Sequence, residues 1–94
     1  MYAVFIEVNA DASVIDKARE GLPREAAPQV REMGAKAGYW LAPNDGRGVA
    51  VLVFETEAEA RDVAGHFKVG ESAGSPVPEV TFRTVEVREV LASV

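Results

Sequence analysis

The sequence contains no cysteine, only one histidine, and no apolar run near the roughly 20 residues that a membrane-spanning helix needs. Without cysteine there is no disulfide framework, no thiolate nucleophile and no cysteine-based metal site. Because His66 is the only imidazole, too few ligands remain for a closed protein site, and we expect neither a metal nor a cofactor.

The apolar first residues lack a basic leading segment and a cleavage site, so we interpret them as a strand and expect a cytoplasmic protein.

Positive charge is scarce and scattered along the chain. Ten Lys and Arg residues stand against fifteen Asp and Glu residues, which gives a formal net charge of −5. Nucleic acids and anionic membrane surfaces attract proteins through clustered positive charge, so we expect neither as a partner. With 48% hydrophobic and 27% charged residues, the composition is that of one folded domain over residues 1–94.

The first third of the chain predicts a strand followed by a helix. Residues 2–8 are rich in β-branched and aromatic side chains and end in a turn cluster, as strands do. From Asp11, an expected N-cap, apolar residues recur at nearly helical spacing as far as position 37. Gly21, Pro23 and Pro28 interrupt this stripe, so we expect a kinked helix or two short helices in line.

The middle of the chain predicts a hairpin and a second helix. Residues 38–42 and 48–55 are strand-like, and the Asp45-Gly46 pair between them supplies the positive φ that tight hairpins need. Residues 56–59 have the sequence of a capping box. One apolar helix face follows at helical spacing: Ala60, Val63, Ala64 and Phe67.

A loop rich in Gly, Ser and Pro at residues 70–78 precedes a last predicted strand at residues 79–91. The complete order is βαββαβ, the ferredoxin-like α+β pattern. That pattern places the first and third strands at the centre of an antiparallel sheet and both helices on one face. The register of the two outer strands stays open at this point.

Both central strands are apolar on both faces. Residues 3–8 alternate between Val4, Ile6 and Val8 on one side and Ala3 and Phe5 on the other, and residues 49–54 are apolar throughout. A strand with one face in water alternates apolar with polar side chains, whereas continuous apolar runs indicate cover on both faces. Because two helices cover only one face, we expect a homodimer in which a second copy covers the other.

Residues 38–41 (Gly-Tyr-Trp-Leu), the Asp45-Gly46 turn and residues 51–60 (Val-Leu-Val-Phe-Glu-Thr-Glu-Ala-Glu-Ala) resemble the dimeric α/β-barrel superfamily, in particular its antibiotic-biosynthesis-monooxygenase-like branch. The resemblance implies two sheets that close into a barrel, with a ligand cavity between the open sheet face and the helices or the partner. Members include cofactor-free monooxygenases, haem-degrading enzymes, lactone isomerases and ligand-sensing modules. The resemblance therefore implies the fold more specifically than the function. Phe54 occupies a position where monooxygenase-like members commonly carry tryptophan.

Two residues are candidates for acid–base chemistry. Glu7 continues the face of Phe5, which we assign to the barrel interior, where burial would raise the pKa of a carboxyl group. The alternative is that Glu7 lies at the barrel rim, in solvent or paired across the dimer with Arg83 or Arg88. His66 could act as a general base or as a lone haem ligand, or it could simply be favoured by the C-terminal end of the second helix.

We therefore expect a homodimeric barrel that binds a small apolar or aromatic molecule. By resemblance it would be a cofactor-independent monooxygenase-like enzyme, with Glu7 or His66 as the base. The alternative is a non-catalytic ligand-binding or sensing module, or a barrel that has lost its activity, and the shortage of polar interior residues favours it. The residues expected to line the ligand site are Phe5, Glu7, Trp40, Leu52 and Phe54.

Residues 70–74 (Gly-Glu-Ser-Ala-Gly) match the G-x-S-x-G motif of α/β-hydrolases, in which the serine is a nucleophile on a strand-to-helix turn. Here the motif follows a predicted helix and leads into a proline-rich segment. The only histidine, His66, precedes the serine. We therefore interpret Ser72 as part of a flexible glycine loop rather than as a nucleophile.

Overall fold

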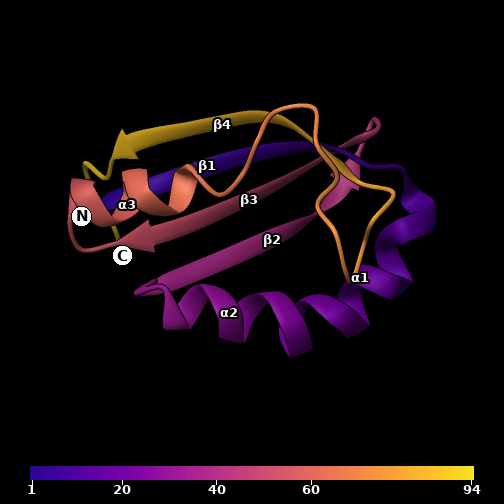
Figure 1. Cartoon of the computed structure of the whole chain (residues 1–94), viewed down its shortest axis with the longest axis horizontal. Coiled ribbons are helices and arrows are strands. Elements are labelled where there is room, and N and C mark those ends of the chain that lie inside the picture. Colours follow the sequence, from indigo (N-terminus) through magenta and orange to yellow (C-terminus); the bar gives the residue numbers. More distant parts are fainter.

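A four-stranded antiparallel sheet organises the chain, and the computed structural model describes it over residues 1–94 (Figure 1). Its strands are β1 (Tyr2–Asn9), β2 (Ala37–Asn44), β3 (Arg47–Phe54) and β4 (Thr81–Glu89). They lie in the order β2-β3-β1-β4, so the first and third strands are central, as predicted. The architecture is an α+β domain compatible with the ferredoxin-like arrangement.

The hairpin between β2 and β3 turns at the predicted pair. Asp45 has a φ of 54° and Gly46 a φ of 77°, so both adopt the left-handed conformation that a two-residue hairpin loop requires. The pairing is regular from Ala37↔Val53 to Leu41↔Val49, then shifts before Asn44↔Arg47.

The first helical run is segmented but continuous, passing through η1 (Ala12–Val14), α1 (Ile15–Gly21), η2 (Leu22–Ala26) and α2 (Ala27–Glu32). Asp11 caps its start, and hydrogen bonds from the hydroxyl and backbone N–H of Ser13 hold the pKa of Asp11 below its usual value. The helix widens into a π-helical turn at η2, which contains Pro23, instead of breaking there. The run ends at residue 32, earlier than the apolar stripe suggested, and Gly34 beyond it has a φ of 107°.

The second helix, α3 (Glu57–Ala64), begins with the predicted capping box. The Thr56 hydroxyl accepts from the backbone N–H of Glu59 at 3.2 Å, and the Glu59 carboxylate accepts from the backbone N–H of Thr56 at 3.2 Å. The helix ends at Ala64, so His66 and Phe67 lie just beyond it. No helix of the chain has the length and apolar character needed to cross a membrane.

One face of the sheet carries the main core and is covered by both helical segments. Val4 pairs with Leu52 and Ile6 with Ala50, so these four side chains point to the same side. Val30 from α2 packs on this side together with residues from α3. The prediction that both helices cover one face is therefore confirmed. The buried side chains of this cluster are Val4, Ile6, Val30, Ala50, Leu52, Phe54, Ala60 and Val63.

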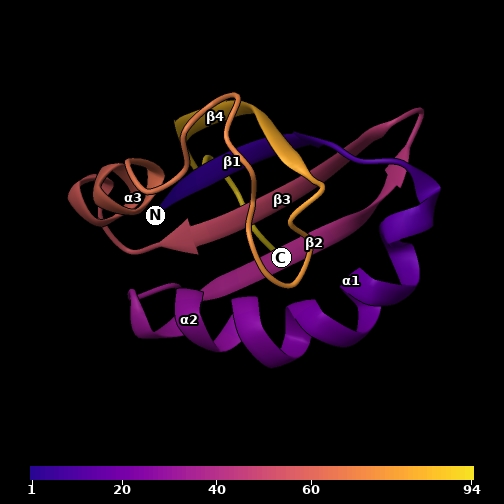
Figure 2. The ribbon, with the colours of Figure 1, turned by 45° about the vertical axis from the view of Figure 1, so that its right-hand side comes forward.

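No helix or strand of the chain lies over the opposite face of the sheet, here called the open face, and the C-terminal residues 90–94 extend on that side (Figures 1 and 2). Phe5 pairs with Val51, and Val51 with Tyr39, which puts these three residues in one row across the face. Tyr39 is 63% exposed and Leu41 is 56% exposed. The open face consists of Ala3, Phe5 and Glu7 of β1, Ala37, Tyr39 and Leu41 of β2, Val49, Val51 and Val53 of β3, and Thr84, Glu86 and Arg88 of β4.

Phe54 offers a direct test of the core, because its side chain is completely buried between the sheet and the helices. We expect Phe54→Ala to lower the free energy of unfolding by about 3–5 kcal/mol, through lost apolar burial and the cavity that remains. Urea unfolding followed by circular dichroism measures this loss. Val69→Ala, at a position that is 64% exposed, serves as the control and should change stability by less than about 0.5 kcal/mol. Equal effects of the two substitutions would contradict this assignment of the core.

Candidate functional site

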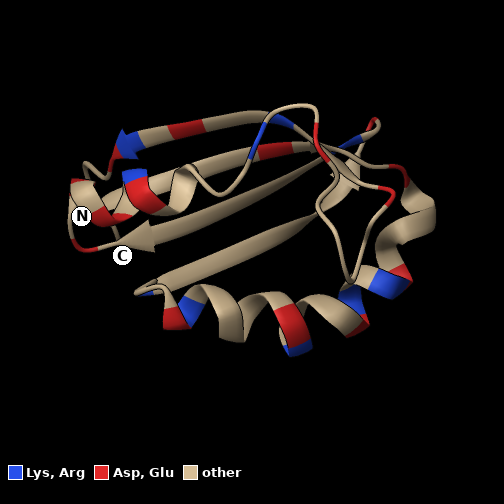
Figure 3. Cartoon of the chain, viewed as in Figure 1, with Lys and Arg blue, Asp and Glu red and all other residues tan.

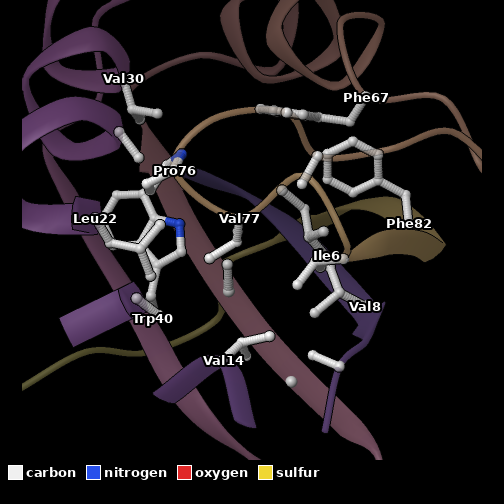
Figure 4. A pocket seen from close by; sticks show the side chains of 18 of the residues that line it. Ile6, Val8, Val14, Leu22, Val30, Trp40, Phe67, Pro76, Val77 and Phe82 are labelled. Atoms are coloured by element: carbon white, nitrogen blue, oxygen red, sulfur yellow. The ribbon is translucent and has the colours of Figure 1, made fainter. Parts of the chain in front are cut away.

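A cavity of about 380 Å³ lies between the helix-covered face of the sheet, the first helical run and the segment at residues 65–80 (Figure 4). This volume is within the range of small-molecule sites in proteins. We call it the helix-side cavity. It lies on the helix-covered side of the sheet, and Leu41 and Val49 of the open face also border it.

The sheet and the helical run supply the floor and one wall of the helix-side cavity. Inward-pointing side chains of the central strands, such as Ile6 and Leu52, form the floor because alternate residues of a strand face the same side. Trp40 reaches in from β2, and Val14, Leu22 and Val30 project from the helical run (Figure 4). None of the lining residues is Asp, Glu, Lys or Arg. The cavity is therefore apolar and carries no fixed charge.

The segment between α3 and β4 closes the cavity from above, crossing the sheet to reach the helical run (Figures 1 and 2). Its Pro76 packs directly against Gly21, where a Cβ atom would lie only 2.4 Å from the proline Cβ. The Ser75 hydroxyl donates to the Glu25 carboxylate at 2.7 Å. Val77 and Val80 of this segment form a small second core with Val14. The loop predicted at residues 70–78 is thus a docked roof of the cavity.

An ion pair between Lys17 and Glu79 also holds this segment to the helical run. The Lys17 Nζ lies 2.8 Å from the Glu79 carboxylate. The hydrogen bond from Lys17 holds the pKa of Glu79 below its usual value. Both side chains are about half exposed, so solvent and salt weaken the pair, and the packing of Pro76 on Gly21 is the firmer attachment.

Ser72 has its hydroxyl occupied by the loop itself. It donates to the carbonyl oxygen of Pro78 at 2.6 Å and accepts from the backbone N–H of Gly74 at 3.0 Å. The serine lies in a loop between helix and strand rather than on a strand-to-helix turn. The structure thus gives this serine a local role in shaping the loop.

Glu7 lies on the open face and not in the helix-side cavity. Its carboxylate is 3.5 Å from Arg83 Nε and accepts a hydrogen bond from the Thr84 hydroxyl at 3.3 Å. The shift in pairing between Glu7 and Val8 against β4 is what places both Arg83 and Thr84 near this carboxylate. The pairing of Glu7 is thus made within one chain.

The five residues predicted to line the ligand site fall into three places. Trp40 and Leu52 border the helix-side cavity. Phe54 is completely buried in the main core, while Phe5 and Glu7 point to the open face. These five side chains therefore do not line one cavity within a chain. Phe5 pairs with Val51, the neighbour of Leu52, and successive residues of a strand point to opposite sides of the sheet.

Several cavity residues were seen in the sequence as core only. The helical stripe that includes Val14, Leu22 and Val30 had the correct spacing, and part of it faces a cavity instead of a packed sheet. Pro76 and Val77 had no periodic signal at all, since a loop has none. His66 also borders the cavity and is exposed to solvent.

Comparisons of the chain with protein-family models, with curated proteins and with solved structures found no match. The chain brings together no group of three or more His, Cys, Asp or Glu side chains that could hold a metal ion.

Gly21→Ala tests whether the roof of the cavity is docked as described. Alanine favours helix over glycine by about 1 kcal/mol, so an undocked roof would make this substitution stabilising. We expect it to be destabilising instead, because the new methyl group collides with Pro76. Urea unfolding shows whether the substitution raises or lowers the free energy of unfolding. Gly65→Ala is the control, because Gly65 is exposed at the end of α3 and its nearest neighbour would lie 3.3 Å from a Cβ atom.

Proposed function

We propose that the protein is a homodimeric binding module that holds one small, uncharged, largely apolar molecule in the helix-side cavity of each chain. The observation that carries this proposal is a cavity of about 380 Å³ without any Asp, Glu, Lys or Arg in its lining. Burying a charged group costs far more than burying an apolar one unless a partner charge is present. The cavity therefore selects against ions and favours neutral apolar ligands.

Binding is favoured over catalysis because the cavity is poor in groups that could move protons. Glu7, one of the two candidate bases, is on the opposite side of the sheet. His66 is then the only ionisable side chain at the cavity, and it is exposed at the edge. Monooxygenase-like chemistry on a phenolic substrate would have to rely on His66 alone for deprotonation.

The open face supports the homodimeric part of the proposal. It presents an apolar band from β2 across β3 to β1, including the largely exposed Tyr39 and Leu41. Exposed apolar patches of this kind mark interaction surfaces. The band belongs to the two central strands and one edge strand, so a flat sheet from another chain fits it better than a single helix would.

Charge along β4 favours a second copy as the partner. Arg88 lies over the ring of Phe5, 5.1 Å from its centroid, and also pairs with Glu86. Figure 3 shows positive and negative residues following one another along this strand. A two-fold axis places the same patch against itself, and a strip of mixed sign matches its own copy where a strip of one sign would repel it.

A pair of neighbouring substitutions tests the dimer. Val51 points to the open face, whereas Leu52 is 1% exposed in the main core. We expect Val51→Asp to yield a folded monomer. The new carboxylate would be buried without a partner charge in the dimer, whereas it faces water in the monomer. Leu52→Asp should lose the fold itself, because it buries an unpaired charge. Sedimentation velocity measures the oligomeric state of each variant, and circular dichroism measures whether it is folded. A wild-type chain that sediments as a 10.1 kDa monomer would refute the dimer.

Ligand binding can be tested with N-phenyl-1-naphthylamine, a neutral apolar dye that fluoresces in apolar surroundings. We expect saturable binding with one dye per chain. Ala26 lines the helix-side cavity and its neighbour Ala27 does not. Ala26→Phe should therefore weaken dye binding at least about tenfold by filling the cavity, while Ala27→Phe leaves it unchanged. Absence of saturable binding by the wild-type protein, or equal effects of the two variants, would contradict the proposal.

A further inference from the structure

The polar groups at the helix-side cavity are few, and most of them are already engaged. The Ser72 hydroxyl is bonded on both sides within its loop, and the Ser75 hydroxyl donates to Glu25. Gln29 and His66 border the cavity but are exposed, so water satisfies them. The remaining polar side chain is Trp40.

Gly38 sets the orientation of the Trp40 ring. The two residues point to the same side of β2, since they are two positions apart. A Cβ atom at Gly38 would lie 3.4 Å from Cη2 and from Cζ3 of the indole. The six-membered ring therefore lies beside the bare glycine backbone. This leaves the pyrrole edge, with its nitrogen, on the cavity side (Figure 4).

The indole N–H of Trp40 has no acceptor within the chain. No hydrogen bond joins it to another residue. Because every buried side-chain nitrogen and oxygen of the chain has a partner, this unpaired nitrogen is not buried. The nitrogen is consequently reachable by a molecule in the cavity, towards which it points (Figure 4). An indole nitrogen can donate one hydrogen bond and accept none.

We propose that Trp40 selects the ligand: the cavity takes a neutral, mainly apolar compound with a carbonyl-type oxygen that accepts a hydrogen bond from the indole N–H. This inference rests on the proposed binding function and narrows it. A ligand oxygen that enters the cavity loses its hydrogen bonds to water, and the unpaired indole N–H of Trp40 replaces one of them. A carboxylate has the same oxygen atoms but finds no balancing positive charge among the lining residues.

The proposal is tested with three bicyclic compounds of nearly equal size. 1-Tetralone is neutral and has a carbonyl oxygen, tetralin is neutral and has none, and 1-naphthoate is an anion. Each competes against N-phenyl-1-naphthylamine on the wild-type protein and on Trp40→Phe, which keeps an aromatic ring and removes the N–H. Tyr39→Phe, the adjacent position on the open face, is the matched control.

We expect tetralone and tetralin to displace the dye and naphthoate to bind at least about tenfold more weakly than tetralone. Trp40→Phe should weaken tetralone by about 2- to 12-fold more than it weakens tetralin, the range that one neutral hydrogen bond spans. Tyr39→Phe should alter neither. Equal weakening of both neutral compounds by Trp40→Phe would overturn the assignment of the N–H as donor.

A second measurement needs no substitution. Trp40 is the only tryptophan, so its indole N–H gives a single proton–nitrogen resonance. We expect tetralone to move this proton resonance downfield and tetralin to leave it without a downfield shift. If both neutral compounds bind and neither moves it downfield, this inference fails while the proposed function stands. If neither compound nor the dye binds, the proposed function itself fails.

Discussion

The strict alternation of side chains along β1 and β3 is the constraint on which the rest of the structure depends. Val4 pairs with Leu52 and Phe5 with Val51, so each step along the paired strands sends an apolar side chain to the opposite side. Both sides of the sheet centre are consequently apolar. The helices and the segment before β4 cover one of them, which leaves a second apolar surface that belongs to the same two strands.

Because of this alternation, the two faces of the sheet carry different features. The helix side carries the core and the cavity, and the open face carries the surface for which we propose a second copy. Neighbouring residues such as Val51 and Leu52 therefore act in different places. The cavity occurs because the first helical run lies along the β2 edge of the sheet and leaves room that the segment before β4 closes with Pro76 and Val77 (Figure 2).

The roof of the cavity depends on a small residue in a helix. Gly21 is a poor helix former, yet only a residue without a side chain lets Pro76 approach as closely as it does. The π-helical turn at η2 follows immediately and lets the run continue past Pro23. Local features that weaken a helix in isolation thus serve the contact that encloses the cavity.

Local patterns in the sequence determined the order of elements, the capping box at Thr56 and Glu59, and the turn at Asp45, because each depends on residues close in the chain. The period of two also showed that the sheet centre is apolar on both sides. Only the tertiary structure decided which residues share a side across different strands, since that follows from pairing register between distant segments. It therefore decided that Trp40 joins Leu52 at a cavity while Glu7 pairs with Arg83 on the other face. The part of the cavity lining that comes from the loop before β4 could not be predicted for the same reason. The packing of Pro76 on Gly21 joins residues that no local pattern relates.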